Sequence, residues 1–298
     1  MTPGAFGVGL QANPTVLEDI GLDRLDSTKF DFLELLCDDY SGPLDGPYVM
    51  FPGARESIDK LFQRKPLIAH GNYGADFGFD PVEQTAAVTR HLPIAEYMRS
   101  PWYTDHMFYG DLAGSYMWSS PLQFSKRELD RVADRAKRLQ DLFGMPLLHE
   151  NAFYYDTFPD STMSEAEFVS ELTERAGTHL LLDLHNIHSN ETNFPGYSAR
   201  RFVETIPLNR VIEIHLAGGQ WFDGWYHDLH NNRVPEPVWE LLDWVLPRAE
   251  NLRAVCLEVQ GPSHNQKSRE VDASWARMID TDLDRARAAW TAHKGAFG

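Results

Sequence analysis

Short apolar runs of strand length recur eight times along this chain, and helical patterns separate most of them. Most of these runs are apolar almost throughout, which is typical of strands that are covered on both faces. Covered strands that alternate with helices indicate an α/β fold with a parallel sheet. The runs are "FGVGL" (6–10), "DFLELLC" (31–37), "PLIAHG" (66–71), "PWYTDHM" (101–107), "PLLHEN" (146–151), "HLLLDLHN" (179–186), "RVIEIHLAG" (210–218) and "RAVCLEVQG" (253–261).

The segments between the runs carry the signals of amphipathic helices. In the segment 125–144, Ser125 and Glu128 have the spacing of a capping box, and Gly144 follows the last apolar residue of the stripe. The segment 164–177 repeats this arrangement. Strands separated by such helices predict a (β/α)8 barrel, whose usual length is about 250 residues.

We therefore expect one TIM-barrel domain that occupies residues 1–298. A doubly wound open sheet is the alternative fold, and it usually carries a Gly-rich phosphate loop after its first strand. The segment "GVGLQAN" (7–13) lacks the third glycine of that loop, so it is weak evidence for a nucleotide site.

Composition excludes several kinds of partner. A formal net charge of −17 at pH 7 argues against nucleic acid, because an acidic surface repels phosphate backbones. No apolar run reaches the roughly 18 residues of a membrane span, and the N-terminus lacks the pattern of a signal peptide. Cys37 and Cys256 make no disulfide framework and are expected in the core. We expect a cytoplasmic protein.

Polar side chains that bind metals or protons stand at the carboxyl ends of most of the runs. In a (β/α)8 barrel these ends converge on one face, where active sites lie. Residues that are far apart in the sequence would therefore share one cavity. They are Asp38 and Asp39 after Glu34, His70, Asp105 and His106, Glu150 and Asn151, Asp183, His185 and Asn186, His215, and Glu258.

The chemistry of this set favours metal ions. Imidazole and carboxylate ligands without thiolate suit iron, zinc or manganese. Asp228 and His230, in the loop after the seventh run, are two residues apart, so both can reach one ion from an extended segment. A single histidine such as His70 is more often a satisfied core residue, but six strand ends together favour a site. The ligands are too many for one ion, which predicts two or three metals bridged by carboxylates.

The sixth run leaves two candidates open. Strict alternation places His185 on the side of Asp183 and Asn186 on the other side, but pleating need not continue past the end of a strand. We expect His188, which lies further along the chain, to be in a loop.

Two further histidines are expected outside the site. His149 should point away from Glu150, because neighbouring residues of a strand face opposite ways, and it should be structural. His293 is expected at the surface.

Aromatic residues crowd the loop after the seventh run. Trp221, Phe222, Trp225 and Tyr226 either line a groove for a peptide or pack this long loop. Trp221 and Trp225, together with Asn151 after the fifth run, are our candidate substrate-binding residues.

At these residues the chain resembles the multinuclear non-haem iron-dependent oxidases, a family long filed as a domain of unknown function. The resemblance covers nearly the whole chain, from "GVGL" (7–10) to "CLEVQG" (256–261). Its specificity lies in the order and spacing of five motifs, which are "TDHM" (104–107), "PLLHEN" (146–151), "LLLDLHNIHSN" (180–190), "IEIHLAGG" (212–219) and "HDLHNNRVPEPVWELL" (227–242).

The resemblance implies a (β/α)8 barrel and a set of metal ligands. Matched position by position, the ligands are His70, His106, Glu150, Asn186, His215, Asp228, His230 and Glu258. Asp183 matches an aspartate that binds or supports a metal, and Asp105 would orient a ligating histidine, as carboxylates commonly do. These two aspartates are our candidate catalytic residues. Because the family asparagine falls on Asn186, the resemblance favours it over His185.

The resemblance also implies the chemistry. Such enzymes use two or three irons in mixed Fe2+/Fe3+ states, with O2 as co-substrate, and modify Cys, Asn or Asp residues of ribosomally synthesised precursor peptides (RiPPs) in natural-product biosynthesis. They usually depend on a separate domain to recognise the leader segment of the precursor. Since the barrel occupies nearly the whole chain, we expect a small recognition partner in trans, or direct binding by the barrel.

The chain departs from the family pattern at three places, and the first two concern the substrate more than the metals. The third run continues as "HGNYGADFGF" (70–79), where relatives are rich in Gly and Leu. The second ends in "DDY" (38–40) instead of Glu-Asn, and Leu229 stands where the family has Thr.

Two other classes of protein have to be weighed. Sugar isomerases and apurinic endonucleases of the metal-dependent (β/α)8 type also place His, Asp and Glu at strand ends, although the net charge disfavours DNA and the sugar enzymes need fewer histidines. A non-catalytic metal-binding protein is the third reading, and it would close its site with protein ligands.

Overall fold

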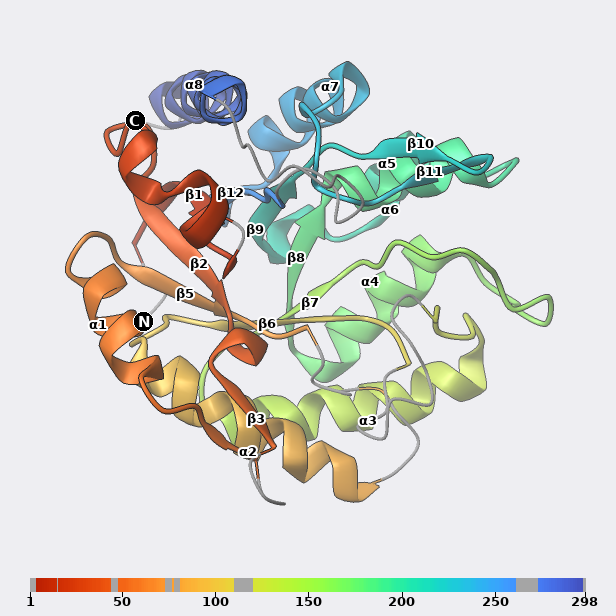
Figure 1. Ribbon diagram of the computed structural model, residues 1–298. Coiled ribbons are helices and arrows are strands. Elements are labelled where there is room, and N and C mark those ends of the chain that lie inside the picture. Colours follow the sequence, from red (N-terminus) through yellow and green to blue (C-terminus); the bar gives the residue numbers. More distant parts are fainter. Residues whose placement is uncertain are drawn as a thin grey trace.

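The computed structural model describes residues 4–14, 16–43, 48–72, 77, 81–109, 120–260 and 273–296. Eight parallel strands close into a barrel, which confirms the predicted fold class (Figure 1). Around the barrel the order is β1 (Gly7–Gln11), β12 (Ala254–Leu257), β9 (Val211–Leu216), β8 (His179–Asp183), β7 (Leu147–Glu150), β6 (Tyr103–His106), β5 (Leu67–His70) and β2 (Phe32–Leu36).

Helices follow most of the barrel strands and surround the barrel (Figure 1). They are α1 (Ala54–Phe62), α2 (Pro81–Tyr97), α3 (Lys126–Phe143), α4 (Glu165–Ala176), α5 (Leu184–Asn193), α6 (Ala199–Thr205), α7 (Glu236–Val245) and α8 (Ala273–Ala296). The connection after β1 differs, because it holds a short π-helix (Val16–Ile20) and a 3-10 turn (Leu22–Arg24). Within the described residues, no helix combines the length and the apolar character that a bilayer span requires.

Two small antiparallel hairpins decorate the barrel. One pairs β3 (Ser41–Pro43) with β4 (Tyr48–Met50) after β2. The other pairs β10 (Gln220–Phe222) with β11 (Trp225–His227) after β9 and projects beside α5 and α6 (Figure 1).

The helix caps form as the sequence predicts. The Ser125 hydroxyl accepts a hydrogen bond from the Glu128 amide at the start of α3, and Gly144 ends that helix in the left-handed conformation with φ 66°. Helix α4 begins with the complete capping box of Ser164 and Glu167. The serine caps fix the starts of α3 and α4, and Gly144 fixes the end of α3, from which the chain returns to the barrel.

The inside of the barrel has an apolar floor. One buried cluster comprises Phe32, Ile68, Trp102, Leu148, Leu181, Ile212, Ala254 and Cys256, as expected for layers of inward-pointing side chains in a closed barrel. Gly9 leaves room for this floor, because a Cβ atom there would lie 2.2 Å from the Phe32 ring. A larger cluster fills the space between the barrel and the helices, and it contains Cys37. The prediction that both cysteines are buried is confirmed.

Two expectations about histidines were wrong. Strand β8 ends at Asp183, and α5 begins at once with Leu184, so His188 is helical and does not lie in a loop. His293 is only 6% exposed, because the last turns of α8 pack its ring near Trp290. His149 is buried, and burial lowers its pKa to about 3, which keeps the imidazole neutral.

Glu165, at the start of α4, gives a testable pH dependence. It is buried and accepts hydrogen bonds from Tyr197 at 2.8 Å and Tyr154 at 3.1 Å. Burial outweighs these bonds and raises its pKa to about 7. The folded chain therefore keeps a proton that the unfolded chain loses near pH 4.5, so the unfolding free energy should fall between pH 4.5 and 7 and level off above.

Glu165→Gln should remove this decline. Its unfolding free energy, relative to that of the unmodified protein, should rise by on the order of 2 kcal/mol between pH 5 and pH 8. Urea titrations at both pH values measure the difference. Parallel pH profiles for the two proteins would contradict the assignment.

Candidate metal centre

The candidate metal ligands form a polar layer directly above the apolar floor. Strand alternation explains the two layers, because residues two apart point to the same side. Ile68 in the floor is followed by His70 in the polar layer, and Leu148 by Glu150. The pairs Leu181 and Asp183, Cys256 and Glu258, and Phe32 and Glu34 repeat the arrangement.

Two histidines and a carboxylate make the first cluster. The Nε2 atoms of His70 and His106 lie 3.4 Å and 3.2 Å from Oε2 of Glu150. His70 and Glu150 are fully buried, whereas the His106 side chain is 20% exposed. The Nδ1 atom of His70 contacts the Thr104 hydroxyl, which fixes its ring and leaves Nε2 directed at Glu150.

The second cluster shares Glu150 with the first. Nδ1 of His215 lies 3.6 Å from Oε1 of Glu150 and 3.2 Å from Oε2 of Glu258, and Asp183 completes the group. One carboxylate therefore faces His70 and His106 with one oxygen and His215 with the other. If metal ions bind here, Glu150 would be placed to contribute one oxygen to each of two of them.

A third cluster lies between α5 and the segment after β11. Oδ1 of Asp228 is 2.7 Å from Nδ1 of His185 and 2.8 Å from Nε2 of His230. His230 also faces Glu258, with 3.7 Å between Nε2 and Oε2. The third cluster thus adjoins the second.

Both candidates after β8 reach this layer, at different places. His185 contacts Asp228, as described, whereas the Asn186 amide nitrogen lies 3.5 Å from Oε1 of Glu150 and 3.0 Å from the Asn151 carbonyl. The helical turn that follows Asp183 separates the two side chains, so alternation could not choose between them. Asp183 also caps this helix by accepting a hydrogen bond from the Asn186 amide at 2.7 Å.

Several buried atoms in these clusters lack hydrogen bonds within the part of the chain that the structure describes. Among the described residues, no hydrogen bond of acceptable geometry satisfies Oε2 of Glu150, Oδ2 of Asp183, Oδ1 of Asn186, Nδ1 of His215 or Oε2 of Glu258. Buried polar atoms are rarely left without partners. Facing atoms such as Nδ1 of His215 and Oε2 of Glu258, 3.2 Å apart, have the separation of two ligands on one ion, which is roughly 3 Å for bonds of about 2.1 Å. The residues present therefore fit metal ions.

The charge balance supports the same conclusion. Burial raises the pKa of Asp183 well above its usual value, and the nearby Glu258 and Glu150 carboxylates raise it further. Burial opposes the charged form of His230, but Asp228 and Glu258 outweigh burial and raise the pKa of His230 to about 10. Both shifts mean that protons balance the charge of these crowded carboxylates, and metal cations would take the place of the protons.

Two other predicted site residues, Asp105 and Asn151, make hydrogen bonds to residues of the barrel strands. Asp105 accepts hydrogen bonds from the Tyr103 hydroxyl at 2.6 Å and from the backbone amide of His106 at 2.8 Å. It thus holds the His106 backbone, while Nδ1 of the His106 ring faces the Gly71 carbonyl at 3.4 Å. Asn151 was expected to bind substrate, but it is 2% exposed and its amide exchanges hydrogen bonds with the backbone of Asp183.

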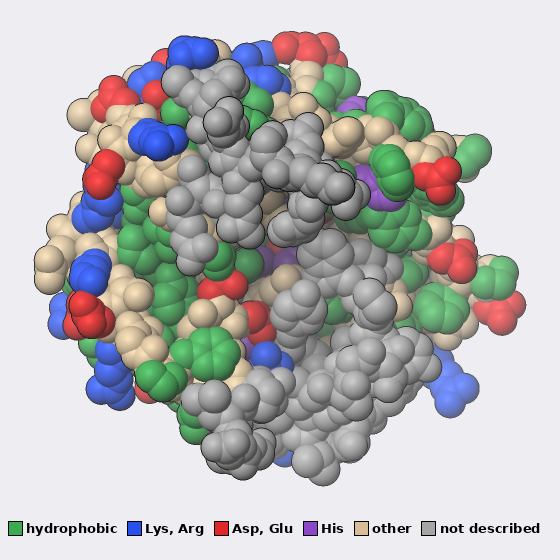
Figure 2. Space-filling view, in the orientation of Figure 1, with side chains coloured by type: hydrophobic (Ala, Val, Ile, Leu, Met, Phe, Trp, Pro, Cys, Tyr) green, Lys and Arg blue, Asp and Glu red, His purple; other side chains and the backbone are tan. Residues whose placement is uncertain are grey.

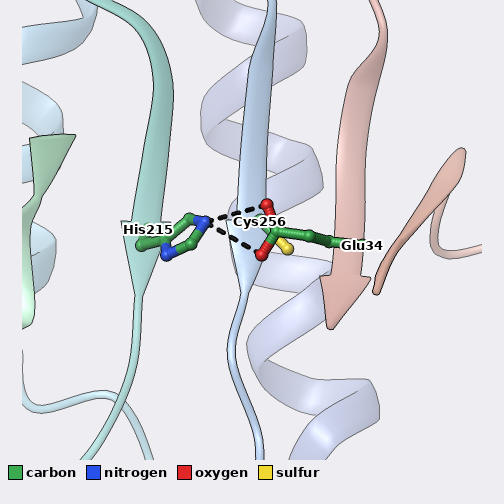
Figure 3. Close-up of side chains that lie close together, drawn as sticks. All are labelled: Glu34, His215 and Cys256. Carbon is green, nitrogen blue, oxygen red and sulfur yellow. Dashed lines mark hydrogen bonds and ion pairs between the residues drawn. The ribbon is translucent and has the colours of Figure 1, made fainter. Parts of the chain in front are cut away.

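Of the polar residues named for the second strand, Glu34 lies within the strand, whereas Asp38 and Asp39 lie beyond its end. Asp38 and Asp39 lie in a 3-10 turn beyond β2, where Asp38 pairs with Arg90 at 2.8 Å and with His91 at 3.2 Å. The strand itself directs Glu34 into the polar layer, beside His215 (Figure 3). Alternation with Phe32 is the sequence signal that distinguishes Glu34 from Asp38 and Asp39.

An aromatic surface adjoins the third cluster. Trp221 and Phe222 in β10 are 59% and 64% exposed, whereas the Trp225 ring packs edge-on against Tyr155. Figure 2 shows hydrophobic and histidine side chains gathered over the β10–β11 hairpin, and acidic and histidine side chains in the hollow near the middle of this face. Trp225 thus packs within the loop, whereas Trp221 and Phe222 face solvent, and a peptide groove at these residues stays a prediction.

The fold and the clusters define a class, namely (β/α)8-barrel proteins with groups of potential metal ligands at the carboxyl ends of the strands. Solved structures of this fold are similar over almost the whole chain. The IolI protein with a bound zinc atom has 13% identity and a TM-score of 0.62, covering 95% of this chain and 99% of that one. Endonuclease IV from Thermus thermophilus has 15% identity and a TM-score of 0.56, covering 94% and 99%.

Sequence comparison identifies the family. Residues 5–277 match the family of RiPP precursor modification enzymes described as MbnB/TglH/ChrH, and the chain belongs to this family. A UPF0276 protein of Rhizobium meliloti is 32% identical over 227 residues, which are 72% of this chain and 69% of the relative. A UPF0276 protein of Caulobacter vibrioides is 28% identical over 265 residues, 88% and 87% of the two chains. The family resemblance expected from the sequence is confirmed.

Proposed function

We propose that this protein is a multinuclear iron oxidase that uses O2 to modify a Cys, Asn or Asp residue of a ribosomally synthesised precursor peptide. Membership of a family of precursor-modifying enzymes supports the substrate class. The three clusters of histidines and carboxylates support the multinuclear centre.

The observation that carries this proposal is the position of Glu150. Its two oxygens face different histidine groups, and Oε2 lacks a hydrogen bond within the described residues. A carboxylate in this position would bridge two ions, and the third cluster would hold a further ion near Glu258.

The ligand types favour iron. The first cluster and the third cluster each offer two histidines and one carboxylate, the set that non-haem Fe(II) oxygenases use and that leaves coordination positions open. Bound iron would supply redox chemistry with O2, which zinc does not, because it has no redox activity. Zinc can nonetheless occupy such a ligand set, so metal content alone does not separate an oxidase from a hydrolase or isomerase.

The chain's own residues would hold the ions and exclude water. Most ligands are almost fully buried, which strengthens their electrostatic interactions. Near the third cluster, the Tyr226 hydroxyl lies 3.4 Å from Nε2 of His185 and accepts a hydrogen bond from the Gly219 amide at 3.1 Å. Tyr226 thereby connects this cluster to the β10–β11 hairpin.

Substrate and partner belong to the same proposal. The exposed Trp221 and Phe222 side chains, beside the third cluster, suit a peptide or a small leader-recognition protein, because aromatic side chains are enriched at such interfaces. We place the reaction in the cytoplasm, where a newly made precursor peptide is available.

Measuring whether the reaction consumes O2 tests this function. Anaerobically prepared, iron-loaded protein is mixed with the precursor peptide and any required partner, and dissolved O2 and the peptide mass are followed together. We expect O2 consumption and a mass change that corresponds to loss of hydrogen, gain of oxygen or loss of carbon. Turnover that continues without O2 in the zinc-loaded protein would contradict the oxidase function and favour a hydrolase or isomerase.

A further inference from the structure

His215 presents its two ring nitrogens to different carboxylates. Nδ1 faces Glu258 and Glu150 in the second cluster. Nε2 lies 3.2 Å from both oxygens of Glu34, on the opposite side of the ring (Figure 3). Since a neutral imidazole has one N–H and one bare nitrogen, one side of this ring donates a hydrogen bond and the other side can accept one or bind a metal ion.

Glu34 is held firmly in its position. It is fully buried on β2, and its neighbour across the β1–β2 pairing, Gln11, is only 2% exposed. The Gln11 amide nitrogen lies 3.3 Å from Oε1 of Glu34 and 2.6 Å from Oε1 of Glu258. One amide thus connects the carboxylate behind His215 with a carboxylate in front of it.

A metal site made by Glu34, His215 and Cys256 is the competing reading, since their potential ligand atoms lie within 4.8 Å of one another. The contacts favour a hydrogen bond instead. Nε2 of His215 has hydrogen-bond geometry toward Glu34, whereas Nδ1 has no such partner among the described residues. Cys256 belongs to the apolar floor, and its Sγ lies 3.9 Å from the Leu257 carbonyl.

We propose that Glu34 is a positioning residue for His215. By accepting the Nε2–H hydrogen bond, Glu34 fixes the ring so that the bare Nδ1 atom faces Glu150 and Glu258, where a metal ion would bind. A carboxylate behind a ligating imidazole orients the ring and strengthens it as a ligand. This inference rests on the metal centre proposed above, but it is independent of iron and oxygen chemistry.

Zinc is the probe for the test, because it is diamagnetic. Protein labelled with 15N-histidine is loaded with zinc, and two-bond 1H–15N correlation spectra report which nitrogen of each ring carries hydrogen. The His215 signals are identified by their absence from His215→Gln. In the unmodified protein we expect His215 to carry its proton on Nε2, with the proton resonance shifted downfield by the bond to Glu34.

Variants of Glu34 separate positioning from folding. Glu34→Gln should move the Nε2–H resonance upfield and weaken zinc binding roughly 10- to 100-fold, the usual effect of losing such a partner, with the number of ions bound at saturation unchanged. Glu34→Asp keeps the charge and should recover part of the affinity. Glu165→Gln, which changes a buried carboxylate outside the clusters, should leave zinc binding unchanged.

The outcomes distinguish the two proposals. No bound zinc in the unmodified protein would overturn the metal centre itself. Bound zinc with Nδ1 protonated in His215, or an unchanged His215 resonance and affinity in Glu34→Gln, would overturn the role of Glu34 alone. Loss of one whole ion at saturation in both Glu34→Gln and Cys256→Ser would make Glu34 a ligand and overturn the positioning role.

Discussion

Glu150→Ala should remove more bound metal than any other single substitution at the mouth of the barrel. Glu150 faces His70 and His106 on one side and His215 on the other, so its loss disrupts two clusters at once. Metal analysis should show a loss of two ions per chain, or of nearly two. Turnover should fall at least roughly 1,000-fold, because bound metal stabilises the transition state by several kcal/mol.

Two comparisons make this result specific. His106→Ala affects the first cluster only, and we expect it to remove about one ion while the second cluster remains loaded. Glu165→Gln should keep the full metal content, because Glu165 hydrogen-bonds Tyr154 and Tyr197 on the outside of the barrel. Equal metal loss in Glu150→Ala and His106→Ala would argue against a bridging role for Glu150.

The second large effect is expected at Asp228. Its Oδ1 atom contacts both His185 and His230, so Asp228→Ala should release the ion of the third cluster and leave the ions around Glu150 in place. We expect turnover to fall by about 100-fold or more, because metal-ligand loss removes several kcal/mol of stabilisation. Metal analysis and peptide mass spectrometry on the same preparation measure both changes.

The β10–β11 hairpin offers a matched control for this variant. Asp223 lies at the hairpin tip, is exposed and has a positive φ of 48°, which Asn tolerates well. Asp223→Asn should therefore retain metal and activity. Full metal content and normal turnover in Asp228→Ala would show that the third cluster is not part of the metal centre.

The barrel and most of its site could be predicted because both depend on a short repeat. Covered parallel strands are apolar, and the inward residue nearest the carboxyl end of a strand enters the common cavity. His70, Glu150 and His215 therefore stood out as polar groups in apolar runs, and the structure brings all three together. Strand alternation also explains the apolar floor below the site, because Ile68 and Leu148 lie two residues before His70 and Glu150.

The sequence was less informative where the regular repeat stops. After Asp183 the chain turns directly into α5, so His185 and Asn186 follow helical geometry and reach different clusters. After Leu36 the chain enters a 3-10 turn, in which Asp38 pairs with Arg90 and lies outside the clusters of the polar layer. Such local changes depend on tertiary packing and are weakly encoded in short segments.

Anomalous diffraction at the iron edge, from crystals of anaerobically iron-loaded protein, tests the central claim most directly. We expect two iron peaks on either side of the Glu150 carboxylate, one beside His70 and His106 and one beside His215 and Glu258. A further peak is expected beside Asp228 and His230. A single peak, or iron bound away from Glu150, would contradict the carboxylate-bridged centre on which the proposed function rests.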